Sequence, residues 1–343
     1  MFDRPLDRRQ LLGGAAALAG ATALPLLGAG PADAAALQSV RYLTPFGFLM
    51  GFAAVLYGET GGFFAKEGLD VVVEGGRGSA MAVQQVTAGN VLLSRTGGTD
   101  LIKAYAKDPS IVAIAEIYNR DIFYVISQES KPIASPADMA GKTIGVVSTG
   151  GATENLLDMM LAAKDVPASS VKRETVGTAP SAFELVKLGR VAAFIATADT
   201  VFQLQTDKAP IHAWSTDDYA PAPGQVYMTS KATLAKDTET LAKFLRAVYA
   251  SIGDMIAKKD NLGPVIASMT AKYEIPEAKR PDKGLAVLKH ALSQTYGPPY
   301  ADKLASNPKQ WQSAYALMVK AKIIQPTADQ NFYDDRARKL AFS

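Results

Sequence analysis

Short runs of β-branched and apolar residues alternate with stretches of helical pattern, and this alternation occurs twice along the chain. The apolar runs begin at residues 40, 69, 91 and 111 in the first series and at residues 143, 170, 191 and 211 in the second. Such alternation is typical of βαβ units, in which helices cover a largely parallel sheet. Because the series restarts, the sequence predicts two α/β lobes.

Two segments that lie 100 residues apart resemble each other. AMAVQQVTAGNVLLSRTGGTDLI begins at Ala80, and PSAFELVKLGRVAAFIATADTVF begins at Pro180. Each has a helical stretch, a glycine at the helix C-cap (Gly89 or Gly189), an apolar strand and a turn of small residues. Duplication of one unit explains this similarity, and so does convergence on a helix–glycine–strand unit. Both explanations give two lobes of the same kind.

The chain is predicted to cross between the lobes in two segments. One is the Pro/Ser/Ala-rich segment Lys131–Asp138, and the other is DDYAPAPGQVYMTS at residues 217–230. Pro and Gly interrupt helix and strand patterns and are typical of connecting segments. We expect the two lobes to be joined by a two-segment hinge with its centres near residues 121 and 222.

The remainder of the chain, from about Thr233, has a helical pattern. Apolar residues recur there at helical spacing, namely Leu241, Phe244, Leu245, Val248 and Ile252. We assign this helical tail to the first lobe, because an apolar helix face must pack against a core. The first lobe is thus predicted at residues 35–121 and 222–343, and the second at residues 122–221.

Residues 1–34 have the pattern of an export signal. Arg8 and Arg9 precede an apolar stretch at residues 11–27, and Ala32 and Ala34 form an A-x-A cleavage site. The Arg pair resembles a twin-arginine signal, with an ordinary secretory signal as the alternative. A retained membrane anchor is a second alternative. We expect cleavage near Ala34 and a periplasmic location, without lipid attachment because the chain has no cysteine.

Composition and charge exclude several classes of function. The 343 residues are 48% hydrophobic and 20% charged, as in soluble globular proteins large enough for two cores. Lys and Arg exceed Asp and Glu by only 36 to 33, a bias too weak to predict nucleic-acid binding. Without cysteine there is no thiol nucleophile, and His212 and His290 lack a metal-binding spacing. We expect no catalytic residue, metal or cofactor, and a protein that is not an enzyme.

The stretch GVVSTGGATENLLDMML at residues 145–161 runs from a strand through a small-residue turn into a helix. It lacks the GK[ST] of a P-loop at the start of the helix, and Val147 and Thr149 break the dinucleotide-binding pattern G-x-G-x-x-G. A helix N-terminus nevertheless offers unpaired N–H donors to a bound ligand. We therefore expect this turn to face a cleft between the lobes.

In parallel α/β sheets, ligands bind beyond the carboxyl ends of the strands, where turns and helix N-termini supply donors. The candidate ligand-binding residues in such turns are Pro45, Phe46, Phe48, Ser79, Arg95, Thr96, Gly97, Thr149, Gly150, Gly151, Thr153, Thr197 and Asp199.

Arg95 is the most informative of these residues, because it ends an apolar strand and precedes a Thr-Gly-Gly turn. Its guanidinium is suited to pair bidentately with a carboxylate or sulfonate in the cleft. The alternative is a structural ion pair with Asp100 or Asp199.

The aromatic residues Phe46, Phe48 and Tyr57 form either a wall of the cleft or part of the core. As a wall they favour an aromatic or alkyl acid over nitrate.

Three segments carry a resemblance to a known family: GFFAKEGLDVVVEGGRGSAMAVQQVTAGNVLLSRTGGTD, SPADMAGKTIGVVSTGGATENLL and VKLGRVAAFIATAD. In this order, from about Val40 to Lys259, the chain resembles periplasmic binding proteins for nitrate, sulfonates, taurine and thiamine-precursor pyrimidines. The resemblance implies a type II periplasmic binding protein fold, with the ligand in the cleft between two lobes. It also implies a monomer that delivers a small anionic ligand to an inner-membrane ABC permease, with Ser79, Thr96, Thr149 and Thr153 as polar contacts.

The chain departs from this family in one motif. The pyrimidine binders have Trp-x-Pro-Asn after the first strand, whereas this chain has Leu-Thr-Pro-Phe-Gly-Phe at residues 43–48. The resemblance therefore does not carry over a thiamine-precursor ligand. Relatives also include a desulfinase and a pyrimidine synthase that use cysteines, which this chain lacks. A periplasmic partner of a membrane sensor is a further alternative to transport.

Overall fold

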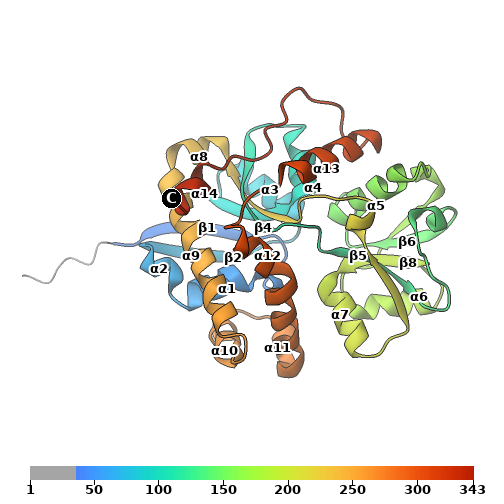
Figure 1. Ribbon diagram of the computed structural model, residues 1–343, viewed down its shortest axis with the longest axis horizontal. Coiled ribbons are helices and arrows are strands. Elements are labelled where there is room, and N and C mark those ends of the chain that lie inside the picture. The colour runs from blue at the N-terminus through green and yellow to red at the C-terminus, as the bar shows by residue number, and fades with distance from the viewer. Residues whose placement is uncertain (1–35) are drawn as a thin grey trace, which may run out of the picture. The chain divides into compact units, whose positions relative to one another are not determined.

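The computed structural model describes residues 36–343, which form two five-stranded sheets (Figure 1). The predicted export signal at residues 1–34 lies outside the described residues. The first sheet contains β1 (Gln38–Thr44), β2 (Leu69–Gly75), β3 (Leu93–Gly97), β4 (Ile111–Tyr118) and β10 (Gln225–Ser230). The second contains β5 (Phe123–Gln128), β6 (Thr143–Val146), β7 (Lys172–Thr175), β8 (Ala193–Thr197) and β9 (Ile211–Ser215). The two α/β lobes predicted from the sequence are confirmed.

The two sheets have the same topology. The strand order is β2-β1-β3-β10-β4 in the first sheet and β7-β6-β8-β5-β9 in the second. In each sheet four strands run in the same direction, and the strand that follows a crossing between lobes, β10 or β5, pairs antiparallel with both of its neighbours. β3 and β8 lie 100 residues apart and occupy equivalent positions. The similarity in sequence thus corresponds to equivalent places in the fold.

Helices in the first part of the chain are α1 (Ala53–Thr60), α2 (Phe63–Lys66), α3 (Ser79–Thr87), α4 (Gly98–Tyr105), α5 (Ala152–Ala163), α6 (Phe183–Lys187) and α7 (Ala198–Thr206). Those after the second sheet are α8 (Lys231–Lys236), α9 (Thr238–Ala257), α10 (Gly263–Thr270), α11 (Pro281–His290), α12 (Gly297–Ala301), α13 (Pro308–Lys320) and α14 (Arg336–Ala341). α3 and α6 both end before a glycine with positive φ, Gly89 at 71° and Gly189 at 70°, which confirms the predicted C-caps.

Each sheet is covered by helices on both faces, because its strands are apolar on both sides. In the second sheet, Ile126, Phe194 and Ala196 pack under α6 and α7, whereas their neighbours Val125, Ala193 and Ile195 face α5. Figure 1 shows α5 on one face of this sheet and α6 and α7 on the other. In the first sheet, α1, α2 and α9 cover one face, while α3 and α4 cover the other.

The predicted crossing at Lys131–Asp138 is wrong. This segment connects β5 with β6, which belong to the same sheet. The strand order places the crossings at residues 119–122, between β4 and β5, and at residues 216–224, between β9 and β10. The prediction failed because the crossing was placed after β5, whereas β5 is the buried antiparallel strand that follows it. The other predicted segment, at residues 217–230, contains the second crossing but also β10.

One side chain links the two crossing segments. The carboxylate of Asp217 accepts hydrogen bonds from the backbone N–H of Asp121 (3.4 Å) and of Ala222 (3.3 Å), and its other oxygen lies 3.4 Å from Nε of Arg120. Gly224 packs so closely that an added Cβ would overlap the carbonyl oxygen of Arg120. The predicted hinge centres near residues 121 and 222 stay a prediction, as do the lobe boundaries.

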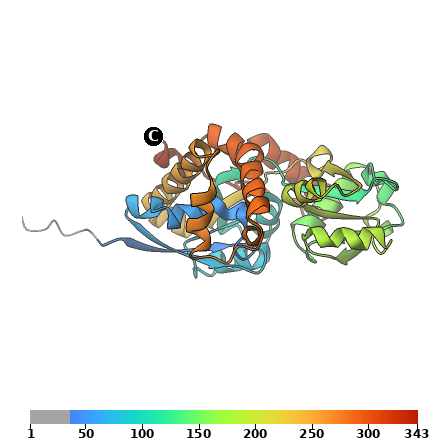
Figure 2. The same cartoon turned by 90° about the horizontal axis from the view of Figure 1, so that it is seen from below.

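The C-terminal helices contact elements of both lobes (Figures 1 and 2). The predicted apolar face of α9 is buried against the first sheet, which places this part of the tail in the first lobe as expected. However, α13 packs against both α4 and α5, and α11 packs against α7 of the second lobe. Between α7 and α11, the rings of Phe202 and His290 stack with centroids 4.9 Å apart. The tail thus borders the space between the lobes.

Within residues 36–343, no helix combines the length and apolar character needed to cross a membrane.

Candidate functional site

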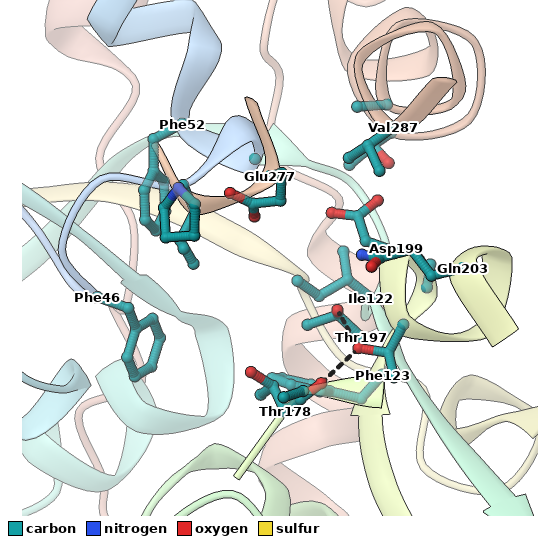
Figure 3. A pocket seen from close by; sticks show the side chains of 18 of the residues that line it. Phe46, Phe52, Ile122, Phe123, Thr178, Thr197, Asp199, Gln203, Glu277 and Val287 are labelled. Atoms are coloured by element: carbon teal, nitrogen blue, oxygen red, sulfur yellow. Dashed lines mark hydrogen bonds between the residues drawn. The ribbon is translucent and has the colours of Figure 1, made fainter. Parts of the chain in front are cut away.

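A cavity of about 400 Å³ is lined by residues of both lobes and of the C-terminal segment. Its aromatic wall consists of Phe46, Phe52, Tyr118 and Phe123. Its polar groups include Arg95 and Gln225 from the first sheet, Thr178, Thr197, Asp199, Thr200 and Gln203 from the second lobe, and Glu277, Arg280, Lys283 and Thr295 from the C-terminal segment. Figure 3 shows part of this lining around one open space, with Phe46, Phe52 and Phe123 among the aromatic side chains and Thr197, Asp199, Gln203 and Glu277 among the polar ones.

The second-lobe wall is built where β8 ends and α7 begins. Thr197 is the last residue of β8 and the N-cap of α7. The hydroxyl of Thr200 donates a hydrogen bond to the backbone carbonyl of Thr178 (2.6 Å) and lies 3.3 Å from the hydroxyl of Thr197, as the dashed lines in Figure 3 show. These bonds connect two turns at the carboxyl end of the sheet, which is where ligands bind in such folds.

Arg95 lies in β3 and is only 2% exposed. Its Nη1 donates to the carbonyl of Gly51 (3.0 Å), and its Nε donates to Oε1 of Gln225 (3.1 Å). The guanidinium carbon lies 4.0 Å from the ring centre of Tyr118, a cation–π contact. The hydroxyl of Tyr118 also donates to the Gly51 carbonyl, at 2.6 Å. Backbone and aromatic groups therefore hold the guanidinium rigidly beside the cavity.

Arg95 has no ion-pair partner among residues 36–343, so the expected alternative of a pair with Asp100 or Asp199 is wrong. Asp100 instead accepts from the side-chain amide of Asn155 (3.2 Å). The hydrogen bonds of Arg95 use Nε and Nη1, and Nη2 makes none to the described part of the chain. One N–H₂ group of a buried cation is thus available to a ligand.

Two carboxyl groups line the same cavity, one from the second lobe and one from the C-terminal segment. Asp199 belongs to the first turn of α7, and Glu277 belongs to the 3₁₀ turn Pro276–Lys279 before α11. Figure 3 shows both carboxyl groups directed into the cavity. Burial, and then the charge of Glu277, raise the pKa of Asp199 to about 7 against the lowering effect of Arg95. Burial also raises the pKa of Glu277, although backbone N–H groups of Glu277 and Met50 oppose this.

Four of the residues predicted from the sequence line this cavity: Phe46, Arg95, Thr197 and Asp199. The other nine, Pro45, Phe48, Ser79, Thr96, Gly97, Thr149, Gly150, Gly151 and Thr153, do not. Phe48 packs on Tyr273 with ring centroids 4.8 Å apart. Tyr57 lies in the core, where its hydroxyl donates to Asp254 (2.7 Å), in agreement with the packing alternative.

The turn at residues 148–153 uses part of its hydrogen-bonding capacity internally. The N–H of Gly150 donates to the carboxylate of Glu154, which lies in the first turn of α5. The hydroxyl of Thr153 accepts a hydrogen bond from the N–H of Val147 (2.9 Å). Only Val147 of this stretch reaches the cavity lining.

The sequence analysis missed Glu277, Arg280 and Lys283, which come from the C-terminal segment. This segment has a helical pattern without any recognisable motif, and only the packing of α11 against α7 brings it to the site. Gln203 was detectable in principle, because it lies one helical turn after Asp199 and thus on the same face of α7.

Among residues 36–343, no group of three or more His, Asp or Glu side chains is placed to hold a metal ion.

Comparison with known proteins identifies relatives along most of the chain. It is 23% identical over 322 residues to the riboflavin-binding protein RibY of Chloroflexus aurantiacus, covering 90% of each chain. It is 25% identical over 245 residues to the formylaminopyrimidine-binding protein of Halalkalibacterium halodurans, covering 69% of this chain and 72% of the relative.

Solved structures share the fold. The periplasmic aliphatic sulphonate-binding protein SsuA of Escherichia coli matches with a TM-score of 0.62 at 15% identity, covering 88% of this chain and 91% of that one. The fold is therefore that of the periplasmic binding proteins, as the resemblance implied. The model of the NMT1/THI5-like family matches residues 50–261, more than half of the chain. The chain belongs to the NMT1/THI5-like family.

Proposed function

We propose that this protein is the solute-binding component of an ABC importer and that it captures a planar heteroaromatic compound in the cavity between its lobes. The observation that carries the proposal is a cavity walled by four aromatic side chains and bordered by polar groups, of which Nη2 of Arg95 and the carboxylate of Asp199 have no hydrogen-bond partner within residues 36–343. Apolar pockets with a few convergent polar groups are typical binding sites for small organic molecules. Two relatives are binding proteins for riboflavin and for formylaminopyrimidine, which supports the same class of ligand.

The size and walls of the cavity favour an organic ring over nitrate. Nitrate would fill a small part of about 400 Å³ and would leave the rings of Phe46, Phe52 and Phe123 without contact. A flat ring contacts these side chains by stacking or edge-to-face packing. Each such contact contributes about 0.5–1.5 kcal/mol in addition to the free energy gained from the buried area.

The charge of the ligand was expected to be negative. Arg95 supports an acceptor group on the ligand, because its Nη2 has no partner among residues 36–343. Asp199 and Glu277 oppose a strong anion, because a like charge brought beside them is unfavourable. A heteroaromatic ring with a carbonyl group at one edge satisfies Arg95 without adding a full negative charge.

Export to the periplasm, with cleavage near Ala34, belongs to this proposal. So do a monomeric state, delivery to an inner-membrane permease and closure of the lobes around hinges near residues 121 and 222. A lining that comes from both lobes supports closure, because a ligand that contacts both lobes stabilises the state in which they approach each other.

Calorimetric titration of the purified mature protein tests the ligand class, with riboflavin, formylaminopyrimidine, ethanesulfonate and nitrate as probes. We expect binding of a heteroaromatic probe, weakened at least tenfold by Phe46→Ala. Phe63→Ala is the matched control, because Phe63 packs on Tyr57 away from the cavity. Binding of ethanesulfonate or nitrate alone would overturn the heteroaromatic assignment.

Two further measurements test the role. Uptake of the bound compound should fall when the gene is deleted, and unchanged uptake would favour the sensory alternative. Mass spectrometry should recover the compound unaltered after incubation with the protein, whereas conversion would show an enzyme.

A further inference from the structure

We propose that Asp199 and Glu277 together form the specificity-determining subsite, which receives adjacent N–H donors of an amino-substituted nitrogen heterocycle. This inference rests on the proposed function, since it names the edge of the ligand that the cavity selects. Glu277 lies beyond residues 50–261, the part of the chain that the family model matches.

The pair is defined by its position across the two lobes. Asp199 projects from α7, and its Oδ2 reaches Gly51 of the first lobe, where an added Cβ would lie 4.0 Å away. Glu277 projects from the opposite wall, and both residues line the cavity. A ligand between them contacts both lobes at once, so the pair is suited to couple recognition with closure.

Both carboxyl groups lack partners for at least one oxygen. Within residues 36–343, Asp199 makes no hydrogen bond or ion pair, and Oε2 of Glu277 is buried without any hydrogen bond. A buried acceptor left unpaired is unfavourable, and more so when it is charged. An amino group on the ring has two N–H bonds and would supply a donor to each residue, as would an amidine.

Most of the other charged groups around the pair already contact other residues of the protein. Arg95 is held by Gly51 and Gln225, and its free Nη2 faces an acceptor. On α11, Nζ of Lys283 pairs with Asp207 at 2.7 Å, and His290 stacks on Phe202. The hydroxyl of Tyr118 donates a hydrogen bond to a backbone carbonyl, and Arg280 also lines the cavity. The protonation of Asp199 therefore affects which ligands fit near neutral pH.

The dependence of affinity on pH distinguishes an N–H donor from an anion. With the pKa of free Asp199 at about 7, a ligand that requires its ionised form loses affinity on acidification. For one proton, this loss amounts to about 30-fold between pH 8 and pH 5.5. An anionic ligand requires the protonated form and has the opposite dependence.

The test uses the mature protein with formylaminopyrimidine and with an analogue in which a methyl group replaces the ring amino group. We expect the amino compound to bind at least tenfold more tightly than the analogue at pH 8, and to weaken about 30-fold at pH 5.5. Asp199→Asn and Glu277→Gln should each remove most of this preference. Glu274→Gln is the matched control, because Glu274 lies near Glu277 but is exposed and paired with Lys279.

The outcomes separate the two proposals. Failure of every heteroaromatic probe at all pH values would overturn the proposed function. Binding without preference for the amino compound, or with affinity that rises on acidification, would overturn only this inference. Asp199→Glu keeps a carboxyl group at this position, so it should retain the amino preference in part. Equal loss in Asp199→Glu and Asp199→Asn, with unchanged melting temperatures, would also overturn it.

Discussion

Replacement of Asp199 by Asn should stabilise the ligand-free protein at pH 8 and have little effect near pH 4. Burial raises the pKa of this carboxyl from 3.8 in the unfolded chain to about 7 in the folded protein. Between these two pH values the folded state binds more protons than the unfolded state, so wild-type stability falls as pH rises. Asn does not titrate, so the stability of the variant does not decrease with pH in this way.

The size of the effect follows from the shift in pKa. A change from 3.8 to about 7 corresponds to about 4 kcal/mol at 1.36 kcal/mol per pKa unit, reached above pH 7. This figure is an upper bound, because Asp199 lines the cavity and is only partly buried. We expect a gain of about 1–3 kcal/mol at pH 8 after allowance for this screening.

Urea denaturation of the ligand-free protein at pH 4.5, 6, 7 and 8 measures the difference between variant and wild type. Asp165→Asn is the matched control, because the Asp165 side chain is 83% exposed. A difference that stays constant with pH, or an Asn variant that is less stable at pH 8, would refute the reasoning.

Three further variants test the site and the hinge. Arg95→Met should destabilise by about 2–4 kcal/mol, since charged hydrogen bonds are lost, and should abolish ligand binding in calorimetry; normal affinity would contradict its role. Gly224→Ala should lower the free energy of unfolding in urea by about 3 kcal/mol or more, because the added Cβ would overlap the carbonyl oxygen of Arg120. Thr200→Val should cost about 1–2 kcal/mol, as it leaves the carbonyl of Thr178 unpaired, and wild-type stability would show that water replaces the hydroxyl.

Most of the fold was predictable because its signals are local. Eight of the ten strands begin within two residues of the predicted positions, since a buried strand needs a short apolar run wherever it lies. β5 and β10 were missed because each follows a crossing and pairs antiparallel, and no α-helix separates it from the strand before it in the chain. The contact of α11 with α7 had no signal in either segment.

The site was predictable only in part, because only some of its residues are marked by a local sequence signal. Arg95, Thr197 and Asp199 lie at strand ends, where topology alone places ligands. Glu277 reaches the cavity only through packing of the C-terminal segment. The 148–153 turn resembled a donor site, but Glu154 in the following turn of helix takes one of its N–H groups, and the sequence pattern does not show which capping contact forms.

The position of β10 determines the order in which the lobes can be completed during synthesis. All strands of the second sheet lie within residues 123–215, whereas the first sheet requires β10 between β3 and β4. Until residue 230 has left the ribosome, β3 and β4 each expose an unpaired edge, which is a hazard for aggregation. The second sheet, whose strands lie in the middle of the chain, can therefore be completed first. The lobe that contains both ends of the described chain matures last, when β10 joins its strands and the C-terminal helices cover them.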